Sequence, residues 1–155
     1  MYGAAKYCPK GPQSCKDQTQ LTDIMANSHN YDELTEAWTG WHSTARPIRK
    51  DYVRFVELAN EGAHELGFAD LGAMWRSNYD MPPDEFTKEA ARLWDQVKPL
   101  YGQLHCYVRG RLQKTYGAAR VPDGKPIPAQ LLGNMWAQQS GSRSEERRVG
   151  KECRS

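Results

Sequence analysis

The chain has 155 residues, of which 39% are hydrophobic, with a mean hydropathy of −0.82 and a formal net charge of +2. This length suffices for one ordinary domain, but no apolar run reaches the roughly eighteen residues that a membrane-spanning helix needs. The surplus positive charge lies in residues 143–155, which hold five Lys or Arg and three Glu, so the neutral remainder argues against a nucleic-acid binder.

The first regular pattern follows an irregular segment at residues 1–19. Helical spacing starts near Leu21. Asn30 is expected to cap the next helix, because its side chain can accept hydrogen bonds from the first backbone amides of that helix. The apolar residues of this helix recur at the spacing of one helical face, at Tyr31, Leu34, Trp38 and Trp41.

A second long helix is expected from Pro47 to Gly67, because proline suits a first helical turn and glycine commonly ends a helix. A short helix is expected over residues 70–79. One stripe of the second helix is apolar and consists of Ile48, Tyr52, Phe55, Val56, Ala59 and Ala63.

The longest helix is expected to start near Pro83 and to end at Gly117, with Pro99 kinking or dividing it. Residues 121–128 are expected to form a loop, and residues 129–139 to begin one more helix. No alternating run supports a sheet, so the predicted fold class is all-α. The apolar seam of the longest helix consists of Leu93, Val97, Leu100, Leu104, Val108 and Leu112.

Two cysteines flank a loop rich in proline and glycine near the N-terminus. Six residues separate Cys8 from Cys15, and a disulfide between them would close this short loop. The alternatives are two free thiols or half of a metal site, which would need further Cys or His nearby. Cys106 lies in the longest helix and is interpreted as a small packed residue rather than a nucleophile.

His64 and Glu65 resemble the start of the zinc-peptidase pattern His-Glu-x-x-His. That pattern needs a second histidine four residues after the first, so that both imidazoles share one helical face. Phe68 occupies this position. No other pair of histidines in the chain has that spacing, so no metal ligand and no catalytic residue is predicted within this chain.

Two strings of residues carry a specific resemblance. Residues 126–138, with the sequence PIPAQLLGNMWAQ, closely resemble the signature of the angiotensin-converting enzyme family, which are zinc peptidyl-dipeptidases. Residues 75–79 resemble the WRS-x-Y segment of that family. Gln130 departs from the pattern, since the family often has His there. The resemblance runs from about Tyr2 to Gly141 and includes residues 25–28, 37–41 and 99–105.

The resemblance implies a larger, mostly helical, two-lobed metallopeptidase that removes C-terminal dipeptides from oligopeptides. In such an enzyme a His-Glu-x-x-His helix and a downstream Glu hold the zinc that activates water. The chain has none of these groups. Residues 1–141 are therefore expected to be a fragment of the peptidase domain, a partial multi-helix array that binds no zinc and is inactive by itself.

The resemblance also implies roles for individual residues. Arg76 corresponds to an arginine that helps to hold a buried chloride, and Tyr116 to a tyrosine of a second chloride site. A disulfide between Cys8 and Cys15 is implied by a similarly placed bridge in the family. Such a bridge indicates an oxidising location, either the periplasm or outside the cell.

Residues 142–155 resemble the conceptual translation of a sequencing adapter and are expected to be a non-native or disordered tail. An alternative function is a self-contained, non-catalytic helical module that binds a peptide or a partner protein. It would need a complete core within these residues.

Overall fold

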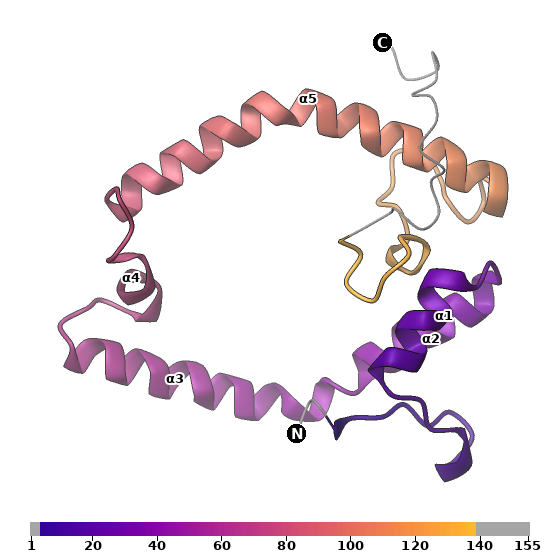
Figure 1. Cartoon of the computed structure of the whole chain (residues 1–155), viewed down its shortest axis with the longest axis horizontal. Coiled ribbons are helices and arrows are strands. Elements are labelled where there is room, and N and C mark those ends of the chain that lie inside the picture. Colours follow the sequence, from indigo (N-terminus) through magenta and orange to yellow (C-terminus); the bar gives the residue numbers. More distant parts are fainter. Residues whose placement is uncertain (1–3, 139–155) are drawn as a thin grey trace. The chain divides into compact units, whose positions relative to one another are not determined.

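The structure is a computed structural model, and it describes residues 4–138 (Figure 1). The tail expected at residues 142–155 lies outside the described residues. Within the described part, the chain forms helices and turns without any strand, which confirms the predicted all-α fold. The elements are η2 (Pro12–Ser14), α1 (Gln18–Asn27), α2 (Tyr31–Ser43), η3 (Arg46–Ile48), α3 (Arg49–Glu65), α4 (Leu71–Arg76), α5 (Pro83–Tyr116) and η4 (Ala129–Leu131).

The described residues fall into two compact units. Unit 1 comprises the chain up to Arg46 together with the chain from Gly102 onward, and unit 2 comprises Pro47–Tyr101. Helices α1 and α2 therefore belong to unit 1, whereas α3 and α4 belong to unit 2. Helix α5 contributes its N-terminal part to unit 2 and its C-terminal part to unit 1.

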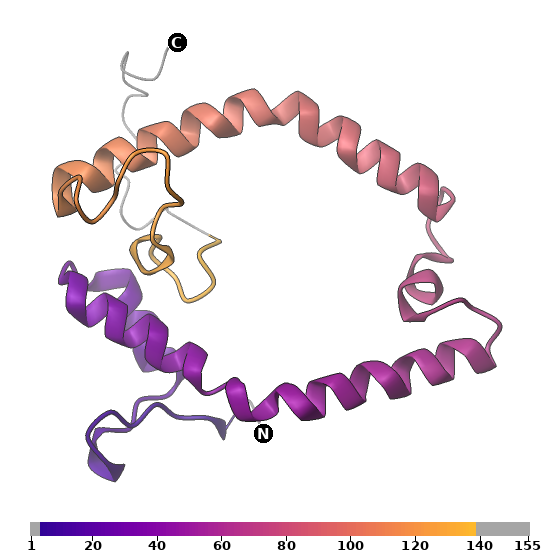
Figure 2. The ribbon, with the colours of Figure 1, turned by 180° about the vertical axis from the view of Figure 1, so that it is seen from behind.

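Unit 1 has a hydrophobic core that joins segments distant in the sequence. Helices α1 and α2 lie side by side in both views of the ribbon (Figures 1 and 2). Gln130 extends this packing, since its Nε2 donates to the hydroxyls of Tyr31 and Thr35 at 3.3 Å each. The buried core consists of Leu21, Met25, Leu34, Ala37, Trp41, Val108, Leu112, Val121, Ile127, Leu131 and Met135.

Single residues set two helix ends of unit 1 where they were expected. Asn30 Oδ1 accepts from the backbone amides of Asp32 and Glu33 at 3.0 and 3.1 Å, which confirms the predicted cap of α2. Gly117 ends α5 with φ at 86°, a left-handed conformation that glycine adopts without a steric penalty. Helix α1 begins at Gln18, earlier than the predicted start near Leu21. Asp17 and Gln20 form a capping box that begins the helix there.

The loop after α5 is held by two side chains of that helix. The Arg109 guanidinium donates to the backbone carbonyls of Pro122 and Lys125 at 2.6 Å each. Gln113 Nε2 donates to the Val121 carbonyl and to Asp123 Oδ1 at 2.8 Å each. These contacts fix the position of residues 121–125 and help to keep Val121 fully buried.

The prediction of a helix beginning at residue 129 is wrong beyond one short turn. Helix η4 ends at Leu131, Gly133 has φ at 84°, and Ala137 has φ at 55°. Asn134 Oδ1 accepts from the amides of Trp136 and Gln138 at 2.8 and 3.2 Å. An asparagine side chain that bonds nearby amides competes with helical hydrogen bonding, so the chain turns here.

Unit 2 contains the expected pair formed by a long and a short helix. Asp70 caps α4 by accepting from the Ala73 amide at 2.7 Å, and Gly67 ends the preceding segment with φ at 83°. Helix α5 continues through Pro99 as one element, so the proline does not divide it. Residues 91–100 are all exposed, and water can therefore solvate the carbonyl that the proline leaves unbonded.

The apolar stripes of α3 and of the N-terminal part of α5 are largely exposed. On α3, Tyr52 is 65% exposed and Phe55 is 53% exposed, whereas Ala63 is buried. The seam of α5 is buried only near its C-terminal end, at Val108 and Leu112. Among the described helices, none combines the length and the apolar character that crossing a membrane requires.

Candidate functional site

A disulfide-closed loop packs on α1 and α2 at the N-terminal side of unit 1. Cys8 and Cys15 are joined by a disulfide, which confirms the predicted bridge and excludes two free thiols at these positions. The backbones of Tyr7 and Lys16 exchange two hydrogen bonds of 2.8 and 2.9 Å next to the bridge. The loop is therefore held at its base by both covalent and hydrogen bonds.

The Tyr7 ring lies directly against the backbone of α2 at Gly40. A Cβ atom at Gly40 would lie 2.4 Å from Tyr7 Cε1, far inside van der Waals contact. Glycine at this position is therefore what permits the loop to dock on the helix. Sequence reasoning assigned no role to Gly40, although it lies within the family-like string at residues 37–41.

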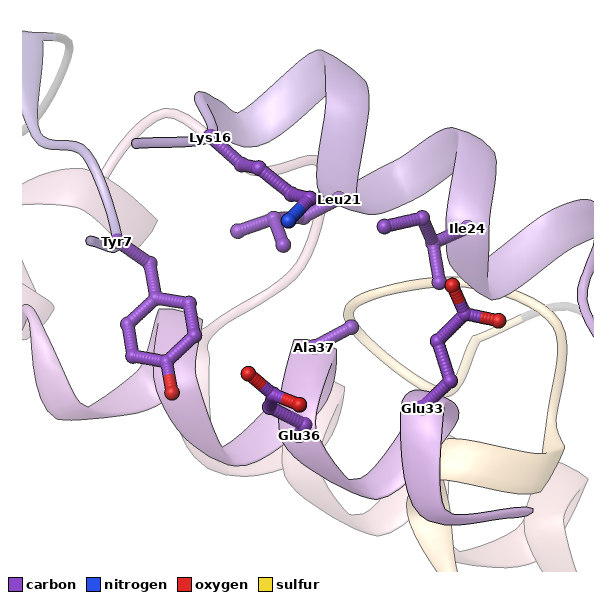
Figure 3. A pocket seen from close by; sticks show the side chains of 7 residues that line it. All are labelled: Tyr7, Lys16, Leu21, Ile24, Glu33, Glu36 and Ala37. Carbon is purple, nitrogen blue, oxygen red and sulfur yellow. The ribbon is translucent and has the colours of Figure 1, made fainter. Parts of the chain in front are cut away.

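A hollow of about 90 Å³ lies between this loop and the two helices (Figure 3). Leu21, Ile24 and Ala37 supply apolar surface, whereas the other side chains carry hydroxyl or charged groups. The loop contributes Tyr7 and Lys16, and α2 contributes two exposed glutamates. One of these, Glu33, accepts from Ser28 Oγ at 2.5 Å. The lining consists of Tyr7, Lys16, Leu21, Ile24, Glu33, Glu36 and Ala37.

The polar groups that line this hollow are a phenol, an ammonium and two carboxylates. The lining contains no His or Cys, the side chains that most often bind zinc. The carboxylates and the ammonium of Lys16 give the hollow groups of both charges.

Tyr116 lies at the C-terminal end of α5, in an aromatic and cationic environment of unit 1. Its ring centroid is 6.1 Å from that of Tyr31, and the guanidinium carbon of Arg120 lies 4.4 Å from the centroid of the Tyr31 ring. A second hollow, of about 50 Å³, is lined by His29, Arg111, Leu112, Thr115 and Tyr116.

Arg111 is a neighbour of Tyr116 that the sequence reasoning missed. Both residues line the same hollow, together with the imidazole of His29. An anion in a protein needs fixed positive charge and hydrogen-bond donors around it, and a guanidinium and a phenol supply these. No spacing signal in the sequence pointed to this pair, because residues three or four apart in a helix share a face and these two are five apart.

Arg76 is the last residue of α4 and belongs to unit 2, whereas Tyr116 belongs to unit 1. Its side chain is half-buried, and its Nε donates to the Gly72 carbonyl at 3.1 Å. Across residues 4–138 no carboxylate lies within ion-pair distance of this guanidinium. Its positive charge is therefore not neutralised by an acidic side chain of the described chain.

The residues present do not fit a zinc ion. His64 Nε2 lies 2.7 Å from the Ala69 carbonyl oxygen, and Phe68 stands where the second histidine would be needed. In the described ranges no group of three or more His, Cys, Asp or Glu side chains is arranged to hold a metal. Cys106 is exposed rather than packed, and no described cysteine is a free thiol.

Comparison with known proteins assigns the chain to a family. The family model described as angiotensin-converting enzyme matches residues 1–146. The chain belongs to the angiotensin-converting enzyme family. It is 45% identical over 141 residues to the angiotensin-converting enzyme of Bos taurus and 43% identical over 143 residues to that of Theromyzon tessulatum. The predicted family and its peptidase class are thereby confirmed.

The matches cover most of this chain but little of its relatives. The alignments take in 89% of the chain, which corresponds to 11% of the Bos taurus protein and 23% of the Theromyzon tessulatum protein. The Sus scrofa enzyme gives the same picture, at 45% identity and 11% coverage. The chain therefore spans at most about a quarter of the length of these members of the angiotensin-converting enzyme family.

Proposed function

We propose that this chain is part of a zinc-dependent peptidyl-dipeptidase that releases C-terminal dipeptides from oligopeptides, and that the 155-residue chain alone is inactive. The membership of the angiotensin-converting enzyme family supports the reaction class. The proposed inactivity rests on one observation. Phe68, not a histidine, stands four residues after His64, and His64 Nε2 lies 2.7 Å from the Ala69 carbonyl oxygen. A peptidase of this class needs two histidines four residues apart on one helical face, and no pair of histidines in this sequence has that spacing.

In this proposal, zinc bound elsewhere in the complete enzyme supplies the Lewis-acid activation of water. The present residues contribute scaffold and binding surface. The core of unit 1 fixes the disulfide-closed loop and the hollow under it, and Arg109 fixes the loop after α5. An oligopeptide substrate would meet these surfaces through side chains such as Lys16, Glu33 and Glu36.

The proposal includes chloride ligands in both units. The half-buried guanidinium of Arg76 has no carboxylate at ion-pair distance among residues 4–138, which is the state expected of a group that pairs with a bound anion. Tyr116 is proposed for a second site, supported by Arg111 in the same hollow. Chloride-35 NMR line broadening tests this, and Arg111→Gln should reduce the broadening.

A location in the periplasm or outside the cell is proposed from the bridge between Cys8 and Cys15. Disulfides persist in oxidising compartments and are rare in the reducing cytosol. The bridge closes the loop that packs on Gly40. The location is tested by alkylating free thiols directly in the source cells and then counting the alkylated cysteines. A reduced Cys8–Cys15 pair would contradict the proposed location.

The inactivity is tested with a blocked tripeptide substrate. The purified chain, supplied with zinc and chloride, is expected to release no dipeptide above a buffer control. Release that is abolished by a chelator and restored by zinc would refute the proposal. A full-length relative assayed in parallel shows that the substrate and the conditions are adequate.

A second candidate is a non-catalytic binding module, which is favoured by the closed core of unit 1. Eleven buried hydrophobic residues form one cluster there, so this unit holds a core of its own. Tryptophan fluorescence measures the binding of oligopeptides to the chain. Saturable binding without any release of dipeptide would favour this function. Failure to bind any peptide would remove it.

A further inference from the structure

A single stretch of the chain builds the hollow under the disulfide-closed loop. Its lining residues all lie between Tyr7 and Ala37, and that stretch belongs to unit 1. The bridge between Cys8 and Cys15 closes the loop on one side, and α1 packs on α2 along the other. We call this space the loop–helix hollow. Its walls therefore do not depend on how the two units are placed.

Groups of opposite charge surround the loop–helix hollow. Figure 3 shows the Lys16 ammonium, carried by the loop, and the carboxylates of Glu33 and Glu36, carried by α2, around the same space. Among residues 4–138 no ion pair joins Lys16 to either glutamate. Glu33 accepts a hydrogen bond from Ser28, whereas the Lys16 ammonium and the Glu36 carboxylate bond to no described residue. Two opposite charges therefore remain available to a ligand.

Apolar side chains form the rest of the wall. Leu21 is 1% exposed and Ala37 is 3% exposed, and both belong to the core of unit 1. Ile24 is half-buried and packs against that core. An apolar group placed here would remove remaining surface of Ile24 from water, which is favourable. The hollow thus sets charged groups beside an apolar surface, within the reach of one small molecule.

The charge pattern selects one class of small ligand. A lone cation would be repelled by Lys16, and a lone anion would be repelled by the two glutamates. An uncharged apolar molecule would remove charged groups from water without replacing their hydrogen bonds. A molecule that carries both an ammonium and a carboxylate satisfies both signs, and an apolar substituent on it would cover the apolar wall.

The volume of the hollow limits the size of that ligand. The hollow measures about 90 Å³. A closed cavity of about 150 Å³ accommodates benzene, so the hollow encloses a group smaller than that ring. Glu33 and Glu36 are exposed, so the charged groups of a ligand can lie at the rim while its apolar substituent is enclosed. A methyl or similarly short side chain fits this space, whereas a dipeptide exceeds it.

We propose that the loop–helix hollow binds a free α-amino acid with a short apolar side chain, of which alanine is the type. The carboxylate of the amino acid pairs with the Lys16 ammonium, and its ammonium pairs with the Glu36 carboxylate. Its side chain lies against Ile24 and Ala37. The binding is non-covalent and does not depend on the proposed peptidase activity.

Titration of the nitrogen-15-labelled 155-residue chain with L-alanine, followed by two-dimensional NMR, tests the binding. The backbone amides of residues 16, 33 and 36 are expected to shift saturably, with a dissociation constant on the order of 1 mM, because exposed charge pairs contribute little. N-acetyl-L-alanine lacks the ammonium and L-alaninamide lacks the carboxylate, so each should bind at least about threefold more weakly. Alanylalanine is larger and separates its charges further, so it should also bind more weakly.

Matched variants test the assigned contacts. Lys16→Met and Glu36→Gln each remove one charge from the hollow and should weaken alanine binding at least about threefold. Lys10→Met and Asp23→Asn are the controls and should keep the wild-type affinity, because both residues are exposed and neither lines the hollow. Circular dichroism checks that the variants keep their helix content.

Several results would overturn the proposal. These are the absence of a saturable shift with L-alanine, and a response confined to amides outside residues 7–37. Binding of either blocked analogue or of alanylalanine as tight as that of L-alanine would also overturn it. Equal affinities of Lys16→Met and Lys10→Met would contradict the assigned carboxylate contact. The comparison of ligands uses the wild-type chain, so it decides the question even where a variant fails to fold.

Discussion

Replacing Gly40 by alanine should destabilise unit 1, although the same change usually stabilises a helix. The added Cβ would lie 2.4 Å from Tyr7 Cε1, so the ring and the disulfide-closed loop must move away from α2. Overpacking of this kind costs about 1–3 kcal/mol. The gain in helix propensity from glycine to alanine offsets roughly 0.5–1 kcal/mol of that cost.

The expected net effect of Gly40→Ala is a loss of about 1–2 kcal/mol in the free energy of unfolding. For a chain of this size that lowers Tm by roughly 2–8 °C. Urea unfolding followed by tryptophan fluorescence measures it. The matched control is Gly110→Ala in α5, also in unit 1, where a Cβ would meet nothing within 4 Å. That variant should gain about 0.5–1 kcal/mol.

A double-mutant cycle identifies the cause of the Gly40→Ala effect. On a Tyr7→Ala background the clash is absent, so Gly40→Ala should become neutral or stabilising. The reasoning is refuted if Gly40→Ala in the wild-type chain stabilises the protein as much as Gly110→Ala does. It is also refuted if the Tyr7→Ala background leaves the penalty unchanged.

Three further predictions concern single contacts. Arg109→Met removes the two donors to the carbonyls of residues 122 and 125 and should cost about 1–3 kcal/mol, measured by urea unfolding, with faster proteolysis of this loop. Replacing Cys8 and Cys15 together by serine opens the short loop and should cost about 2–3 kcal/mol in the same assay. The hydrogen bond from Arg92, aided by its charge, holds the pKa of Glu89 below its ordinary value. Arg92→Gln should therefore raise that pKa, measured by NMR titration. The small stability that this exposed pair contributes should be lost as pH falls through the pKa of Glu89 in the folded chain.

Helix ends were predictable where one side chain decides them. Asn30 and Gly117 act on the backbone within one turn, so their chemistry is legible in the sequence alone. The turn after η4 was not predicted, although single residues decide it as well. A helix was expected over residues 129–139, but the bonds that Asn134 Oδ1 accepts and the left-handed conformation of Gly133 turn the chain after η4.

Burial was less predictable than helicity. The spacing of Tyr52 and Phe55 identifies an apolar face, but periodicity does not say what covers that face, and in unit 2 both residues are exposed. For the candidate sites, the bridge between Cys8 and Cys15 followed from the family resemblance. The cationic neighbour of Tyr116 emerged only once the helix placed Arg111 beside the same hollow.

Zinc stoichiometry tests the central claim most directly. The folded 155-residue chain, equilibrated with zinc and then dialysed, is analysed for metal per chain. Because Phe68 stands where a second histidine would be needed beside His64, we expect far less than one zinc per chain. One tightly held zinc per chain, released by a chelator and required for cleavage of a peptide, would contradict the account.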